Sequence, residues 1–190
     1  MCGQYFISDD SGDEKMKALI DGMEKKYAGA YRTGEIHPGD TAPAMIAVRD
    51  RILPCPAVFG FPGFQKNRLL INARSETAAE KKTFASLLKT QRIILPASSF
   101  YEWSRDERRT KYCFTVADRI TLYLCGIYQI IDGNCHFVIL TRAANASMAE
   151  THDRMPVIAA EREVRPYLTD SEAAAEIISG AAPTLTRQSA

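Results

Sequence analysis

Hydrophobic and polar positions in the first third of the chain predict a strand, a helix and a hairpin. Residues 3–7 alternate as in a short strand. Apolar residues then recur at helical spacing behind two acidic residues, at Met16, Leu19, Ile20 and Met23. The segment 34–64, GEIHPGDTAPAMIAVRDRILPCPAVFGFPGF, mixes β-branched residues with proline and glycine. This mixture predicts strands interrupted by loops, with a hairpin turn near residues 49–51.

The remaining pattern predicts one further helix, a β-rich region and two final helices. The helix is expected over residues 77–91, because Thr77 and Glu80 have the spacing of a capping box. From Arg92 onward, β-rich runs with a tight turn at Asp-Gly-Asn predict strands over 92–103, 111–117, 121–131 and 135–143. Helices are expected over 162–168 and 171–180, the second ended by Gly180, and 181–190 is expected to be a loose tail.

This order of elements predicts a mixed α+β fold. No internal repeat or low-complexity linker divides the chain, so a single domain over residues 1–180 is expected. Strands far outnumber helices and follow one another closely, which favours a largely antiparallel, barrel-like sheet with helices at its periphery.

Composition limits the classes of function. The 190 residues are 46% hydrophobic and 25% charged, as in an ordinary soluble domain, and no run reaches the length of a membrane span. A cytoplasmic location is therefore expected. The five cysteines form no C-x-x-C pair, so reduced thiols are expected rather than a disulfide framework or a metal site. The net charge of +1 gives no global sign of nucleic-acid binding, so any such surface must be local.

The chain begins MCGQYF, which places a cysteine directly after the initiator methionine. Removal of Met1 would leave Cys2 with a free α-amine and a thiol on adjacent carbons, and both groups titrate near neutral pH. Any residue can follow Met1, so position alone does not establish a role. The rest of the chain has to supply the evidence.

Three more polar residues stand beside apolar runs, where function is common. They are Asn72 in INARSE, Glu102 in FYEW and His152 in THDRMP. Each also has a structural explanation: Asn72 could shape a turn, Glu102 could point outward from a strand, and His152 could cap a helix near residues 145–150. Glu102 stands between Tyr101 and Trp103, and so points to the opposite face of the strand from both rings. A carboxyl on the inner face suits proton transfer.

Five segments together resemble one protein family. MCG, INARSE, RIILPASSFYEW, VILTRAAN and HDRMP occur in this order, between residue 1 and about residue 168, as in the SRAP family of SOS-response-associated peptidase proteins. The resemblance implies the SRAP α+β fold and no cofactor. It also implies covalent capture of abasic sites in single-stranded DNA, with loss of Met1 through the protein's own peptidase activity.

The resemblance also assigns roles residue by residue. Cys2 would form the crosslink, Glu102 would be the acid/base group and His152 a second catalytic group. The residues placed near Cys2 or the DNA are Asn72, Arg74, Pro38, Thr141 and, as support of the site, Arg154. Beside the resemblance, Phe59, Phe61, Phe64 and Trp103 are candidate aromatic platforms for the bases. The rings of Phe59 and Trp103 could instead belong to the core. Two segments depart from the family pattern, namely Gln4 where arginine is common and FGFPGF where tryptophans are common.

The chemistry of these residue types agrees with the resemblance. An abasic deoxyribose is a masked aldehyde; a proton shuttle such as Glu102 opens it, and the Cys2 amine condenses with the carbonyl. The tethered thiol then closes a thiazolidine ring at high effective concentration.

Two other readings stay open at this point. An N-terminal-nucleophile amidase would use the Cys2 sulfur on an acyl carbon, without DNA. A non-enzymatic single-strand binder would not need Cys2. For the abasic-site capture that the resemblance implies, the expected partner is single-stranded DNA containing abasic sites, bound by a monomer.

Overall fold

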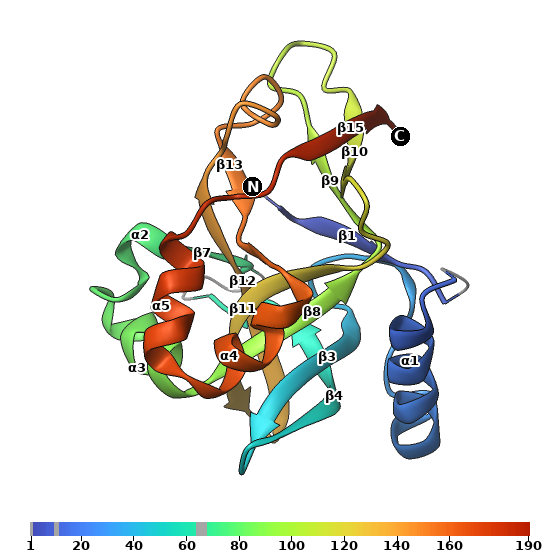
Figure 1. Ribbon diagram of the computed structural model, residues 1–190, viewed down its shortest axis with the longest axis vertical. Coiled ribbons are helices and arrows are strands. Elements are labelled where there is room, and N and C mark those ends of the chain that lie inside the picture. Colours follow the sequence, from blue (N-terminus) through green and yellow to red (C-terminus); the bar gives the residue numbers. More distant parts are fainter. Residues whose placement is uncertain (1, 10–11, 64–67) are drawn as a thin grey trace.

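A closed ring of strands forms the centre of the molecule (Figure 1). The computed structural model describes residues 2–9, 12–63 and 68–190. Strands pair around the ring in the order β12-β4-β3-β8-β11, and β11 also pairs with β12. Every pairing in the ring is antiparallel except that of β12 with β4. The ring strands are β3 (Thr41–Val48), β4 (Arg51–Phe59), β8 (Arg92–Ala97), β11 (Leu122–Ile131) and β12 (Asn134–Ala143).

Short strands extend the ring. β7 (Asn72–Arg74) runs parallel to β12, and β13 (Arg154–Pro156) runs antiparallel to it. β14 (Ile158–Ala159) pairs with β11, while β5 (Phe61–Pro62) and β6 (Leu69–Leu70) form a separate two-stranded ribbon. The two partners of the carboxyl end of β12 therefore come from distant parts of the sequence.

A second sheet is built from both ends of the chain. Its strands lie in the order β15-β10-β9-β1-β2, and β1 pairs antiparallel with both β2 and β9. They are β1 (Gln4–Ile7), β2 (Gly34–Ile36), β9 (Ser99–Trp103), β10 (Lys111–Val116) and β15 (Leu185–Ser189). The mixed α+β class and the ring-like, mainly antiparallel sheet are thus confirmed.

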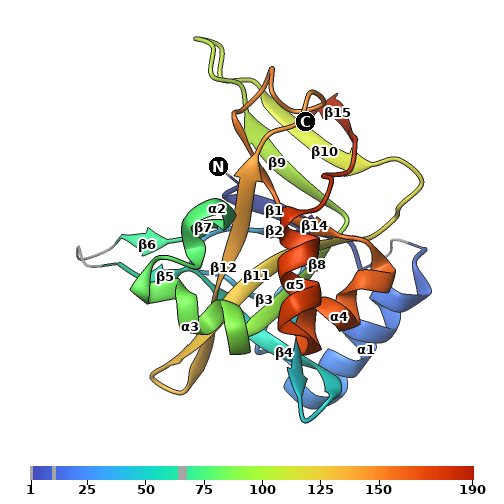
Figure 2. The same cartoon turned by 60° about the vertical axis from the view of Figure 1, so that its left-hand side comes forward.

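The helices lie at the periphery, as Figure 2 shows. They are α1 (Glu14–Tyr27), α2 (Ser75–Ala78), α3 (Lys82–Thr90), α4 (Val164–Thr169) and α5 (Ser171–Ser179), with a 3-10 turn at Glu161–Glu163. The single helix predicted over 77–91 is wrong. The Thr77 carbonyl accepts from Glu80 N and Lys81 N, Lys81 is extended, and a new helix begins at Lys82. Two short helices let Ala78, Phe84 and Leu87 all reach the core.

The ring strands bury side chains on both faces. Along β12, Phe137 and Ile139 belong to one apolar cluster, whereas Val138 and Leu140 belong to a second cluster that includes residues of α3, α4 and α5. This alternation is the period of a strand covered on both sides. In the first cluster, Phe59 stacks on Phe137 with ring centroids 4.9 Å apart. Each face of the sheet therefore has its own core.

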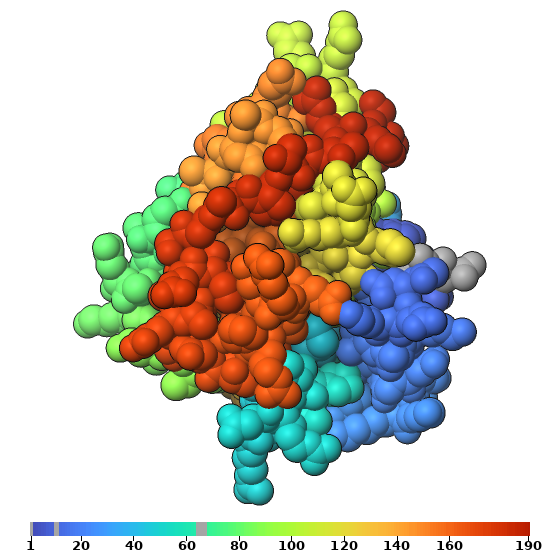
Figure 3. Space-filling view, viewed as in Figure 1, coloured from blue at the N-terminus to red at the C-terminus, as the bar shows by residue number. Residues whose placement is uncertain are grey.

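The expected loose tail over 181–190 is also wrong. Residues Leu185–Ser189 form β15, which pairs with β10 over five residue pairs, and Ala190 N donates to the Lys111 carbonyl. Figure 3 shows this segment lying against the body of the protein. Pairing covers the edge of β10, and Leu185 is buried, so a short polar sequence is held by tertiary contacts.

Arg92 is a structural residue rather than part of a basic surface. Its side chain is buried, Nε donates to the Tyr167 carbonyl at 2.5 Å, and the two Nη atoms reach carbonyls of Leu88 and Leu168. These carbonyls lie at the C-terminal ends of α3 and α4, where the helix dipole favours a positive charge. Arg92 therefore fastens two helix ends to the ring.

All five cysteines are free thiols. Among the described residues, no helix combines the length and apolarity needed to cross a bilayer.

Candidate active site

Cys2 lies between the second sheet, whose strand β1 follows it, and β7, which extends the ring. Cys2, which precedes β1, is only 1% exposed. Asn72 at the start of β7 donates from Nδ2 to the Cys2 carbonyl oxygen at 3.0 Å. Asn72 is itself 8% exposed, and its Oδ1 has no hydrogen-bond partner among the described residues. The Nδ2 group of Asn72 thus holds the backbone of Cys2, and its Oδ1 remains as a hydrogen-bond acceptor beside Cys2.

The Cys2 thiol lies in an apolar environment. Burial is the main cause that raises the pKa of the thiol well above its ordinary value, and the negative charge of Glu102 raises it further. The thiol is therefore protonated at neutral pH. The thiol is buried, but Glu102, the residue predicted to act with it, is close enough for its charge to affect the thiol pKa.

Glu102 lies on the inner face of β9. Its cross-strand partner is Tyr112 of β10. Glu102 is 5% exposed, whereas its neighbours Tyr101 and Trp103 are half-buried. The predicted alternation along FYEW is therefore confirmed, and the outward-pointing alternative for Glu102 is wrong. A carboxyl in this position can exchange protons with groups inside the protein.

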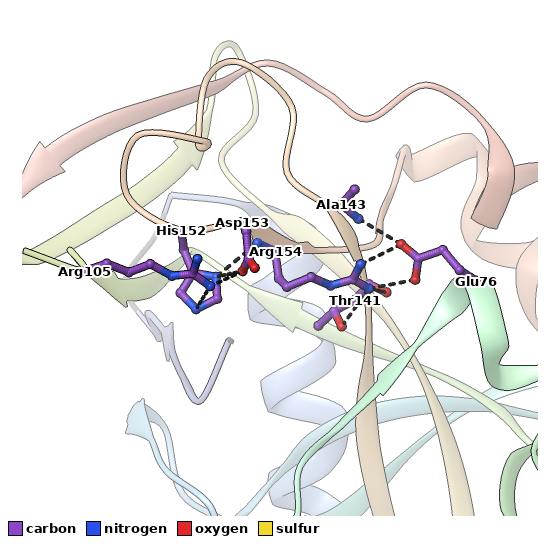
Figure 4. A network of polar contacts seen from close by, with 7 residues as sticks. All are labelled: Glu76, Arg105, Thr141, Ala143, His152, Asp153 and Arg154. Atoms are coloured by element: carbon purple, nitrogen blue, oxygen red, sulfur yellow. Dashed lines mark hydrogen bonds and ion pairs between the residues drawn. The ribbon is translucent and has the colours of Figure 1, made fainter.

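His152 occupies the connection between β12 and β13, and its side chain is 13% exposed. Nδ1 lies 3.0 Å from the backbone N of Arg154 and 2.9 Å from Asp153 Oδ1, and Nε2 lies 3.5 Å from Arg105 Nη2 (Figure 4). Burial is the largest cause that lowers the pKa of His152; Arg105 adds to it, while the charges of Glu102 and Asp153 oppose it. The helix expected near residues 145–150 is a series of turns, so His152 does not cap a helix.

Glu102 and His152 open onto a common cleft of about 490 Å³. Its other lining residues include Trp103, Arg105 and Arg109. Both Cys2 and His152 lie within electrostatic reach of Glu102. The structure therefore brings together the four residues singled out from the sequence: Cys2, Asn72, Glu102 and His152.

Arg154 forms an internal ion pair rather than a DNA contact. Its two Nη atoms contact Glu76 Oε1 at 2.6 Å and Oε2 at 2.8 Å, and Nη2 donates to the Thr141 carbonyl at 2.6 Å (Figure 4). The Arg154 guanidinium lowers the pKa of Glu76 to about 2. Because Glu76 neutralises its charge, Arg154 is not available as a phosphate contact in this structure. Thr141 is fully buried, so the expectation that it faces DNA is also wrong.

The expected aromatic platforms are only partly available. Phe59 and Phe61 lie in the two cores, because apolar rings in these strands gain more by burial than by exposure, so their assignment to DNA is wrong. Phe64 lies outside the described residues. Trp103, in contrast, borders the cleft. Gln4 is buried in β1, so the side chain of residue 4 is not available as a surface contact in this structure.

Two other residues predicted near DNA are accessible. Pro38 and Arg74 are exposed, and Arg74 has no ion-pair partner within the described part of the chain.

Sequence reasoning did not single out Arg105 or Asp153, which surround His152. The adjacency of Asp153 to His152 in HDRMP was an available signal, whereas Arg105 was visible only as one cation among several. No group of three or more metal-ligating side chains occurs in the described ranges.

Curated proteins similar to this chain are named abasic site processing proteins. An abasic site processing protein, YobE of Bacillus subtilis, is 36% identical over 106 residues, covering 52% of this chain and 48% of YobE. The chain thus spans about half the length of this relative. Escherichia coli YedK, also named an abasic site processing protein, is 28% identical over 200 residues, covering 96% of this chain and 88% of YedK.

The fold and a family model match over nearly the whole chain. A crystal structure of a Bordetella bronchiseptica protein superimposes with a TM-score of 0.77 at 21% identity, covering all of this chain and 99% of that one. The model of the SOS response associated peptidase (SRAP) family matches residues 1–188. The protein therefore belongs to the SRAP family, whose curated relatives are named as abasic site processing proteins.

Proposed function

We propose that this protein captures abasic sites in single-stranded DNA through a thiazolidine formed by Cys2, after removal of Met1. The observation that carries the proposal is the convergence of Cys2, Asn72 and Glu102, which come from three separate segments of the chain. His152 shares the cleft with Glu102. A carboxylate, an imidazole and an aminothiol together are sufficient for every proton transfer that the reaction requires.

Ring opening comes first. The closed abasic sugar loses a proton from its anomeric hydroxyl while the ring oxygen gains one, and an aldehyde is released. Glu102 can accept the first proton and deliver the second because a single carboxyl serves both directions. The Asn72 amide holds the Cys2 carbonyl, which keeps the amino terminus beside Glu102 without adding a competing base.

Crosslinking follows in two bond-forming steps. The Cys2 amine attacks the aldehyde carbon, and the carbonyl oxygen leaves as water to give an imine. The thiol sulfur then bonds to the imine carbon, and its proton is transferred to nitrogen. The raised pKa of the buried thiol keeps the sulfur protonated, which favours attack by the amine first. The tether between amine and thiol makes ring closure effectively intramolecular.

The removal of Met1 is part of the proposal, because an acylated nitrogen cannot form the imine. We assign this hydrolysis to the protein's own peptidase activity at the Met1–Cys2 bond. Intact mass measurement of the purified protein should show a chain that begins at Cys2. A fully active protein that retains Met1 would contradict the mechanism.

Single-stranded DNA is the proposed partner because the target sugar must reach a recessed site. Arg74 and Pro38 offer exposed contacts, and Trp103 borders the cleft, where a base could stack. The net charge is only +1, so a few local cations rather than a global field would hold the phosphates. We propose that a monomer binds the strand.

The test uses a single-stranded oligonucleotide with one abasic site. The wild-type protein should give a denaturation-resistant adduct with the combined mass of protein and DNA minus one water. Cys2→Ser retains the amine, so its adduct should survive only after borohydride reduction, and Cys113→Ala, a cysteine of β10, should behave as wild type. Absence of a wild-type adduct, or a stable unreduced adduct in Cys2→Ala, would reject the proposal. An acyl-enzyme formed with an amide substrate would instead favour the amidase alternative.

A further inference from the structure

The C-terminal strand β15 contacts both segments that carry the proposed acid/base groups. Figure 1 shows β15 beside β10, with which it pairs, and β10 pairs in turn with β9, the strand of Glu102. The same end of the chain contacts residues 145–151, which directly precede His152. β15 therefore connects the sheet that carries Glu102 to the segment that carries His152.

Two of these contacts hold the first part of the segment 145–151. The side chain of Asn145 donates from Nδ2 to the Pro183 carbonyl oxygen at 2.9 Å. The backbone N of Leu185, the first residue of β15, donates to Ser147 Oγ at 2.9 Å. The segment is therefore attached to the C-terminal end of the chain at its beginning.

Arg187 makes the contact closest to His152. Its Nη1 donates to Thr151 Oγ1 at 3.1 Å, and Thr151, the residue before His152, is only 1% exposed. Its Nη2 lies 3.1 Å from Glu150 Oε2, and the Glu150 side chain is 80% exposed. Because an exposed ion pair contributes little, the bond to the buried Thr151 hydroxyl is the contact that holds the segment.

The same guanidinium also contacts the sheet that carries Glu102. Arg187 Cζ lies 4.9 Å from the ring centroid of Tyr112, a favourable cation–π contact, and Tyr112 is the cross-strand partner of Glu102. Leu185, two residues earlier and on the same face of β15, is buried, so strand alternation directs Arg187 toward this side. Arg187 thus contacts one immediate neighbour of Glu102 and one of His152.

We propose that Arg187 is a positioning residue that fixes His152 in the cleft relative to Glu102. It does so by holding Thr151 against the sheet formed by β9, β10 and β15. The effect on crosslinking rests on the proposed function, whereas the effect on residues 148–153 can be measured without DNA. Arg187 acts through Thr151 and is not assigned a contact with DNA or with the reacting sugar.

The first measurement is amide hydrogen exchange of the free protein. Arg187→Met keeps an unbranched side chain over Tyr112 but removes the donors and the charge. The amides of residues 148–153 should exchange roughly 3- to 10-fold faster in this variant, as expected for the loss of one partly exposed hydrogen bond. Thr151→Val removes the acceptor of the same bond and should have the same effect. Gln188→Ala, at an exposed position on the opposite face of β15, is the control.

The second measurement is the rate of crosslinking with a saturating abasic oligonucleotide. Arg187→Met should lower this rate by roughly 3- to 10-fold, because His152 is less often in place to transfer a proton. The affinity for an intact single strand should stay unchanged, which separates positioning from DNA binding. Glu150→Gln breaks only the exposed ion pair and should react at close to the wild-type rate.

A double variant tests whether the effect passes through Thr151. Arg187→Met and Thr151→Val remove the two sides of one hydrogen bond, so the variant that carries both should react no more slowly than the slower single variant. Losses that add would show that Arg187 acts by another route and would overturn the inference.

The two proposals fail in different ways. A wild-type protein that forms no crosslink rejects the proposed function, and the exchange measurement still tests the position of residues 148–153. A normal wild-type crosslink, with unchanged exchange or an unchanged rate in Arg187→Met, rejects only the inference about Arg187. Weaker binding of the intact strand in Arg187→Met would place Arg187 on the DNA surface and would also overturn it. A thermal melt checks each variant, and Thr151→Val decides the question if Arg187→Met does not fold.

Discussion

The side-chain amide of Asn72 donates to the main-chain carbonyl of Cys2 at 3.0 Å, although 70 residues separate the two in the sequence. β7 runs parallel to β12, with Asn72 opposite Ile139, and this pairing sets the position of the amide. The start of the chain is therefore held by the ring rather than by β1 alone. This contact makes the geometry of Cys2 dependent on a strand of three residues.

Asn72→Ala should slow crosslinking without preventing it. The buried carbonyl of Cys2 would lose its donor, at a cost of about 1 to 2 kcal/mol, which corresponds to a rate roughly 5- to 30-fold lower if the loss falls on the reactive geometry. Single-turnover kinetics with the abasic oligonucleotide measure the effect. Asn134→Ala, at the exposed start of β12, is the control. Equal rates for wild type and Asn72→Ala would show that the contact does not position Cys2 for reaction.

Glu102→Gln should lower the rate of adduct formation by about 10²- to 10⁴-fold, the usual contribution of a general acid/base. Glutamine keeps the size of the side chain but cannot exchange a proton. The rate should be measured with saturating DNA so that binding is not limiting. Glu107→Gln removes an exposed carboxylate from the same cleft and should have little effect. If both variants react at the wild-type rate, the acid/base group is another residue.

Arg74→Gln should weaken DNA binding and flatten its dependence on salt. Each phosphate contact on a single strand contributes about 0.7 to the slope of log affinity against log salt concentration, so the slope should fall by about 0.7. Binding of an intact single strand, measured by fluorescence anisotropy over a salt series, gives the slope. Arg119→Gln, at an exposed position in the loop before β11, should leave it unchanged. An unaltered slope in Arg74→Gln would remove Arg74 from the phosphate-binding surface.

Glu76→Gln should destabilise the protein near neutral pH but much less in acid. The folded pKa of Glu76, about 2, is lower than its ordinary value of 4.5, so its ion pair with Arg154 stabilises the fold fully above about pH 4.5. This stabilisation is lost as the pH falls toward 2. Since Glu76 is half-exposed, the effect at pH 7 should be on the order of 1 kcal/mol. Urea unfolding at pH 7 and pH 3 tests this, and a difference that does not shrink at pH 3 would contradict it.

Deletion of residues 185–190 should destabilise the whole domain. It removes the buried Leu185, whose burial contributes about 1.5 to 3 kcal/mol, and exposes the edge of β10. The midpoint of urea unfolding should fall accordingly. Leu185→Ala, which retains the strand, separates the side chain from the pairing. A truncated chain as stable as the full one would mean that β15 adds nothing to the fold.

The sequence by itself determined the elements whose local signals agree with their packing. The hairpin at residues 49–50 formed where polar residues separate two apolar runs, and both residues adopt positive φ. The alternation in FYEW placed Glu102 on the buried face, because the side-chain period of a strand is fixed by its backbone. Asn72, Glu102 and His152 could be named because they are polar residues beside apolar runs, and Cys2 because it directly follows Met1.

Only the tertiary structure decided where these residues meet and which others surround them. The break before Lys82, the pairing of β15 with β10 and the burial of Phe59 and Phe61 all depend on surfaces supplied by distant segments. The same is true of Arg154, whose charge is neutralised by Glu76, and of Arg105, which reaches His152 across 47 residues of sequence. Local sequence patterns determine the face of a strand to which a side chain points. The residue that pairs with a charged side chain depends on which distant segments the fold brings together.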